Sequence, residues 1–391
     1  MTLFNPERLK SARLLSGFSL REVEQRLSHR VSYNAISKYE KGKMQPDAGT
    51  VILLSQVLKV KASYFFEQSA IELGEIDFRK KSTLSQTEIE QIKIKTRDKV
   101  QRYLEAESIL GISQKFINPI IRKQVKDVAR VEELADIIRT EWGLGVNPIP
   151  NVIEMLEEHQ VKVIEVDGPE KFDGLSTFVD DGTPVTVINE NFTVERKRFT
   201  ALHELGHLMM NFKVESNKEQ EAACHRFAGA MLFPQSEVLK SFGERRNNIS
   251  MGELVAIKEE YGISIQAAMR RLFDLNVISQ PTYKFFCMRM ASNKKEEGIG
   301  SFKGEERSSR LLKMAFRLFS EGVVTFERGA ELAGVPTKIF NALYNNVSSE
   351  EVEENYFYKS TLNSFSKAWD EGEAEYTIDD IKFVNPDYEP R

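Results

Sequence analysis

Cysteine is scarce in this chain, since Cys224 and Cys287 are the two cysteines among 391 residues. Two cysteines cannot build the disulfide framework of a small secreted domain, and such a sequence suits a reducing compartment. Long hydrophobic runs are also lacking, because no apolar stretch approaches the roughly 18 residues that a membrane span requires. The opening segment, MTLFNPERLKSARLL, does not have the basic-then-apolar order of a signal peptide. We therefore expect a cytoplasmic protein without a membrane partner.

Charge is distributed unevenly along the chain. The formal net charge of −5 excludes a chain that is basic throughout. Residues 1–67 nevertheless hold 11 Lys and Arg against 6 Asp and Glu, a balance of +5, whereas residues 346–391 hold 4 basic against 12 acidic residues, a balance of −8. This asymmetry predicts a basic head that meets nucleic acid. The acidic tail is a solvated surface, a surface for a partner, or a DNA mimic that guards the head.

Residues 1–70 have the pattern of short helices separated by turns, which predicts an all-α N-terminal domain. Ser19 precedes an apolar helical pattern and Glu22 follows three residues later, as in a capping box. Gly42 ends a later helical pattern, and Asp47 is placed to cap the next. The expected helices span residues 6–16, 20–27, 32–41, 50–58 and 62–66.

Three further parts follow the head. Residues 71–129 are charged with weak helical periodicity, and we interpret them as a partly helical linker. Residues 130–275 combine helical and strand-like patterns, and residues 276–391 form a C-terminal region that is mostly helical to about Asn345 and ends in the acidic tail. Helices are expected over 131–142, 153–159, 195–212 and 218–232, and strands over 161–166, 174–179 and 184–189. The predicted fold class is α+β, mainly helical, with a small sheet.

The sequence His203-Glu204-Leu205-Gly206-His207 indicates a metal site. Two histidines at i and i+4 project from one face of a helix, so both imidazoles can reach one ion. Glu204 lies beside them without being a ligand, where it can accept a proton from a water molecule that the ion acidifies. Three of the five histidines fall between residues 203 and 225, which favours a metal site over incidental surface histidines. Gly206 costs the helix about 1 kcal/mol relative to Ala, so we expect a structural reason for it, such as the close approach of another backbone segment.

A catalytic zinc needs a third protein ligand and one open position. The next predicted helix offers three candidates, and spacing alone does not choose among them: Glu219, Glu221 and His225.

The segment EAACHRFAGAMLFP at 221–234, which follows ALHELGH, resembles the ImmA/IrrE family of zinc metallopeptidases. The resemblance covers about residues 130–240. It implies a zincin-like metallopeptidase domain over 130–275, with Glu221 as the third ligand beside His203 and His207. It also implies one Zn²⁺ per chain, with Mn²⁺ as an alternative. Cys224 stands where the family usually has Ala, a small residue replacing a small one. His225 lies one turn after Glu221. It either supports the metal ligands through a contact, stabilises the transition state, or is a structural histidine.

The head resembles the Xre-type helix-turn-helix of phage repressors. The resemblance is carried by Leu20, Ile36, Tyr39, Glu40, Gly42 and Pro46, in the expected order. In such folds the recognition helix enters the major groove of double-stranded DNA with its N-terminal residues first. We expect base contacts from Tyr33 and Asn34, with Ser37 on the same exposed face. Phosphate contacts are expected from Arg21, Lys38, Lys41 and Lys43.

One such head covers a half-site, so a two-fold related operator would imply a homodimer. The alternative is a helical module that has lost DNA binding and docks a protein. Residues 322–337, with Ala330-Glu-Leu-Ala-Gly334, are either a second, degenerate helix-turn-helix or part of a helical hairpin packed on the peptidase-like domain.

These features predict a zinc-dependent peptidase coupled to sequence-specific DNA binding. The resemblance implies a protein substrate such as a repressor or an antitoxin, and a role in transcription, stress or mobile-element regulation. Two alternatives remain. One is a regulator whose metal-bound peptidase fold senses a signal without cutting, and the other is an antitoxin-like binder that holds a partner. The intact Glu204 favours hydrolysis, because a pure sensor has no need of a general base.

Overall fold

The computed structural model describes residues 4–66, 84–125, 127–179, 182–213 and 216–345. Within these ranges helices dominate, and the strands form one sheet of two strands and one of three, so the predicted mainly helical α+β class is confirmed. The acidic tail at 346–391 lies outside the described residues, as does the first part of the predicted linker at 67–83. In the described part of the chain, no helix is long and apolar enough to cross a membrane.

The head forms the expected helices around a small apolar core. They are α1 (Pro6–Leu15), α2 (Leu20–Arg26), α3 (Tyr33–Glu40), α4 (Ala48–Val57) and the 3-10 helix η1 (Ala62–Phe66). The predicted capping box of Ser19 and Glu22 is present, and Asp47 accepts a hydrogen bond from the Thr50 amide. The core is fully buried at Leu9, Ile36, Leu54 and Phe65. Local capping signals therefore place the start of each helix, and the apolar residues fix how the helices pack.

The segment that we interpreted as a partly helical linker contains α5 (Gln86–Leu110), a single helix of 25 residues. It begins with a capping box between Ser85 and Glu88 and ends at Gly111, whose left-handed backbone suits glycine. Ile92 and Val100 of α5 join an apolar cluster with residues of the three-stranded sheet. This helix is therefore part of the folded body that carries the sheet.

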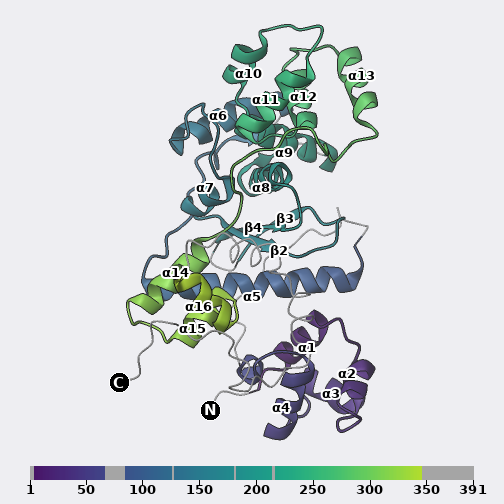
Figure 1. Cartoon of the computed structure of the whole chain (residues 1–391), viewed down its shortest axis with the longest axis vertical. Helices are drawn as coiled ribbons and strands as arrows, with labels where there is room; N and C mark the ends of the chain where they lie inside the picture. The colour runs from purple at the N-terminus through teal and green to yellow at the C-terminus, as the bar shows by residue number, and fades with distance from the viewer. Residues whose placement is uncertain (1–3, 67–83, 126, 180–181, 214–215, 346–391) are drawn as a thin grey trace, which may run out of the picture. The chain divides into compact units, whose positions relative to one another are not determined.

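The three-stranded sheet has the order β2-β4-β3, with β2 (Lys162–Val166), β3 (Gly174–Phe178) and β4 (Pro184–Asn189). The central strand β4 runs parallel to β2 and antiparallel to β3. In Figure 1 the sheet lies between α8 (Val194–Met209) and α5. Side chains alternate accordingly: Val187 joins the cluster on the α5 side, and its neighbour Ile188 joins the cluster on the α8 side.

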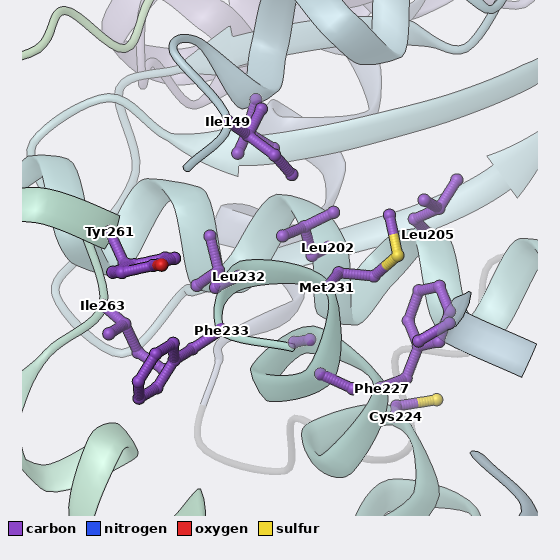
Figure 2. Packing of buried hydrophobic residues seen from close by; sticks show 14 of the residues in the cluster. Ile149, Leu202, Leu205, Cys224, Phe227, Met231, Leu232, Phe233, Tyr261 and Ile263 are labelled. Atoms are coloured by element: carbon purple, nitrogen blue, oxygen red, sulfur yellow. The ribbon is translucent and has the colours of Figure 1, made fainter. Parts of the chain in front are cut away.

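The main core lies around α8 and α9 (Asn217–Leu232), which pack against each other. Figure 2 shows Leu202 and Leu205 of α8 beside Phe227 and Met231 of α9, all fully buried. The other helices of this part are α6 (Val131–Glu141), α7 (Val152–Glu158), α10 (Gln235–Phe242), α11 (Met251–Tyr261), α12 (Ile265–Asp274) and α13 (Gln280–Met290).

The prediction that the metal-site helix continues to Phe212 was wrong. The helix ends at Met209, and the backbone of Met210 is extended. The short strand β5 (Asn211–Phe212) then pairs in parallel with β1 (Gln124–Val125). Apolar periodicity could not show this end, because the pairing partner lies far away in the sequence.

The C-terminal region is mostly helical, with α14 (Arg310–Ser320), α15 (Phe326–Ala333) and α16 (Thr337–Asn345), but residues 291–309 form no helix, so the prediction of a region helical to about Asn345 holds only in part. Both α14 and α15 contact α5, and Arg328 of α15 forms an ion pair with Glu105 of α5. Of the described residues, those from Lys338 to Asn345 in α16 belong to a unit separate from the rest.

Candidate metal centre

His203 and His207 lie one helical turn apart on α8. Their Nε2 atoms are 3.2 Å from each other, and both side chains are partly buried. The i, i+4 spacing directs both rings to one side of the helix, as the sequence predicts. The helix therefore presents two imidazole nitrogens at one point in space.

Glu221 reaches the same point from α9. Its Oε2 is 3.2 Å from His203 Nε2, and its Oε1 is 3.3 Å from His207 Nε2. These three side chains form a group of donor atoms that all lie within 4.8 Å of one another.

Gly206 permits the close packing that brings α9 to the histidines. A Cβ atom at Gly206 would lie 3.1 Å from Met210 Cε, 3.2 Å from Phe227 Cδ1 and 3.3 Å from Cys224 Sγ. Two of these atoms belong to α9. The sequence predicted a close neighbour at this glycine, but side chains rather than another backbone segment occupy that place.

The group has the composition and spacing that a zinc ion requires. Two imidazole nitrogens and one carboxylate oxygen are common zinc ligands, and metal–ligand bonds of about 2.1 Å in a tetrahedron place neighbouring donors roughly 3.4 Å apart. The observed separations of 3.2 and 3.3 Å agree with that value. Three protein donors leave the fourth position open, which is the arrangement of a catalytic rather than a structural site.

The two other candidates for the third ligand are not in the group. Glu219 is exposed at the start of α9, and its carboxylate accepts a hydrogen bond from Ser216 Oγ at 3.0 Å. Ser216 caps the helix by accepting a hydrogen bond from the Glu219 amide, so the Glu219 carboxylate lies at this cap and not in the donor group.

His225 stacks beside the group, with its ring centroid 4.4 Å from that of His203 and 5.8 Å from that of Phe199. His225 is exposed at the surface, and desolvation of its ring, together with the neighbouring His203, lowers its pKa to about 4. Near neutral pH it is a neutral imidazole that can donate or accept one hydrogen bond. His203 Nδ1 is buried without a hydrogen-bond partner among the described residues, so ring contacts hold His203 in place.

Glu204 follows His203 on α8, and its carboxylate reaches the edge strand of the sheet. Successive residues of a helix point about 100° apart, so Glu204 cannot share the face of His203. Its side chain is buried, with 7% exposed, and Ser176 Oγ of β3 donates a hydrogen bond of 2.8 Å to its Oε2. Ser176 cannot be recognised from the sequence, because a strand pattern does not show which helix residue a serine will contact.

The residues expected to contact DNA lie on the head. Tyr33, Asn34 and Lys38 are exposed on α3, and Ser37 is half-buried. Arg21 of α2 lies over the Tyr33 ring at 5.6 Å from its centroid. The exposed Lys41 and Lys43 follow the end of α3.

Arg13 of α1 binds Glu40 at the C-terminal end of α3, the expected recognition helix. Its Nε donates to Glu40 Oε1 at 2.6 Å, and its second guanidinium nitrogen donates to Glu40 Oε2 at 3.0 Å. This bidentate pair fixes the C-terminal end of α3, so the exposed face of α3 is rigidly presented.

Fold and site together define a class of protein, in which a helix-turn-helix head is joined to a peptidase-type domain with a His–Glu–His helix. Comparison with protein families gives the same two parts. Residues 9–65 match the helix-turn-helix family model, and residues 156–273 match the peptidase family described as the IrrE N-terminal-like domain. The chain thus joins an Xre-like helix-turn-helix region to a region that matches the ImmA/IrrE-type peptidase family, which supports a DNA-binding regulator with a peptidase-family domain. No curated protein matches the chain.

Proposed function

We propose that this protein is a zinc-dependent peptidase coupled to sequence-specific DNA binding, which regulates by cleaving a protein such as a repressor or an antitoxin. The observation that carries the proposal is that α8 provides both metal-ligand candidates and, next to them, a carboxylate that is free to act as a base. His203 and His207 meet Glu221 as a three-donor group, and Glu204 on the next face is held by Ser176 without joining that group.

The donor group suits one zinc ion, with manganese as an alternative. A bound zinc would supply Lewis acidity that polarises a peptide carbonyl and acidifies a water molecule. Glu204 would accept the proton of that water and return it to the leaving amine, which is the task of a general base and acid. The low exposure of Glu204 protects its carboxylate from competing solvent.

The edge strand β3 offers a place for an extended protein segment. Among the described strands, β3 pairs with β4 on one side and with no strand on the other. A peptide can pair with such an edge through its main chain, which gives affinity without a fixed side-chain sequence. Because Ser176 of this strand contacts Glu204, a peptide paired along β3 would pass beside the general base.

The DNA-binding head supplies the second half of the proposal. The exposed side chains of α3 and the cations around it are placed to contact an operator, so the peptidase would act near a chosen site on DNA. A substrate that itself binds that DNA, such as a repressor, is thereby brought close to the protease.

Co-expression followed by mapping of new protein N-termini tests the hydrolytic function. We expect new termini with the wild-type chain and with Glu219→Gln, which changes a carboxylate outside the donor group. The same termini should be absent with Glu204→Gln, which keeps the metal ligands. Equal cleavage by Glu204→Gln would overturn the mechanism. No cleavage by any variant, with DNA binding intact, would favour the regulator that senses without cutting.

A further inference from the structure

We infer that Ser176 is a positioning residue that fixes the orientation of the Glu204 carboxylate. The inference rests on the proposed function, in which Glu204 is the general base. It adds a residue outside the metal-binding helices, contributed by the edge strand β3.

The backbone around Ser176 is held tightly against α8. A Cβ atom at Gly174 would lie 2.7 Å from Thr200 Cγ2 and 2.7 Å from the Val187 carbonyl oxygen. The strand can therefore approach α8 this closely only because residue 174 has no side chain. Two residues later on the same face, Ser176 meets Glu204, which lies one turn after Thr200 on α8.

The hydrogen bond from Ser176 selects one carboxylate oxygen. It is the only hydrogen bond that the described part of the chain provides to the Glu204 carboxylate, and it is made to Oε2. Oε1 is left to act on a proton at the site. Without the hydroxyl, the carboxylate would rotate about its last torsion, and the fraction of time that an oxygen faces the site would fall. A hydrogen bond to an ionised group is among the stronger ones in proteins, so the loss should be measurable.

The opposite strand offers a matched control. Thr186 of β4 is the register partner of Ser176, and it too is on the α8 face of the sheet. It is fully buried, but its hydroxyl has no hydrogen-bond partner among the described residues. Thr186→Val thus removes a hydroxyl from the same face without removing a hydrogen bond to Glu204.

Binding of acetohydroxamate to the cobalt-substituted full-length chain gives a readout that needs no substrate. A hydroxamic acid chelates a divalent metal and gives up a proton, which a correctly oriented general base accepts. The visible spectrum of the cobalt reports both the donor set and the dissociation constant. We expect Ser176→Ala to keep the spectrum of the ligand-free protein and to weaken acetohydroxamate binding about 10-fold or more. Ser176→Thr and Thr186→Val should stay within about threefold of wild type.

The Glu204→Gln background separates positioning from other effects of the serine. If Ser176 acts through Glu204, adding Ser176→Ala to Glu204→Gln should cause no further loss of affinity, so the two effects are non-additive. Additive losses, or a Ser176→Ala affinity within twofold of wild type, would overturn the inference. If Ser176→Ala fails to bind cobalt, Ser176→Cys, which keeps the size and a weak donor, is compared with wild type by the same criteria. If Glu204→Gln itself leaves acetohydroxamate affinity unchanged, the general-base role in the proposed function fails instead.

Discussion

Replacing Gly174 by Ala should destabilise the protein, and the structure gives the size of the effect. The backbone of Gly174 is not in the left-handed region, so Ala is strained there only by its methyl group. That methyl would lie 2.7 Å from both Thr200 Cγ2 and the Val187 carbonyl oxygen, and neither can swing aside, because one belongs to a β-branched side chain and the other to the backbone. Overpacking typically costs about 1–3 kcal/mol, which exceeds the roughly 0.5–1 kcal/mol that Ala otherwise gains over Gly in a strand. Taking the middle of each range, we expect a net loss of about 1 kcal/mol in the free energy of unfolding.

Gly252→Ala is the matched control for this prediction. Gly252 lies in the first turn of α11, and a Cβ atom there has nothing within 4 Å. The same substitution should therefore be neutral or stabilise by up to about 1 kcal/mol. Urea unfolding followed by circular dichroism compares the two variants with wild type. If Gly174→Ala is as stable as Gly252→Ala, the tight packing of β3 on α8 is wrong, and the placement of Ser176 beside Glu204 is wrong with it.

Three further results are expected. Asn34→Ala should relax operator preference at one base position at a cost of about 1–3 kcal/mol, whereas Lys38→Ala should weaken binding to all sequences and reduce the salt slope by about 0.9 in gel shifts. Burial raises the pKa of Glu157 from 4.5 to about 7. The contribution of this residue to stability is therefore present below pH 4.5 and is lost as the pH rises to about 7. Glu157→Gln should remove this decline when urea unfolding is measured across a pH series. Glu306→Ala breaks a fully buried ion pair with Arg198 and should cost about 3–5 kcal/mol, while Glu305→Ala, at an exposed carboxylate, should change thermal stability little.

Local signals in the sequence were enough for the helices of the head and for two of the three proposed metal ligands. The Ser19 capping box and the spacing of His203 and His207 depend on residues a few positions apart, so helical geometry alone fixes them. Glu221 lies on another helix, and spacing alone could not distinguish it from Glu219 and His225 as the third ligand. Family resemblance selected it, because the packing of α9 on Gly206 cannot be read from one helix.

The contribution of α5 could not be foreseen, because its charged residues look solvated in the sequence. Lys95 Nζ donates to the Asp167 carbonyl oxygen at 2.8 Å, and Lys99 Nζ donates to the Glu165 carbonyl oxygen at 2.5 Å. This contact to β2 places Lys99 in the interface between α5 and the sheet, where burial lowers its pKa. Charged side chains that serve an interior contact weaken the apolar periodicity by which a packed helix is recognised.

Ser176 was missed for a related reason. Its role depends on the register of β3 against β4 and on the closeness of β3 to α8 at Gly174. Neither quantity is encoded in a local pattern, since a strand pattern predicts which residues share a face and not what that face meets.

Metal content is the most direct test of the central claim that His203, His207 and Glu221 form one zinc site. Elemental analysis of the purified full-length chain should give about one zinc, or one manganese in its place, per molecule. Glu221→Ala should lose that metal, and Glu219→Ala, two residues away on the same helix, should keep it. Full metal content in Glu221→Ala together with loss in Glu219→Ala would contradict the assignment of the site.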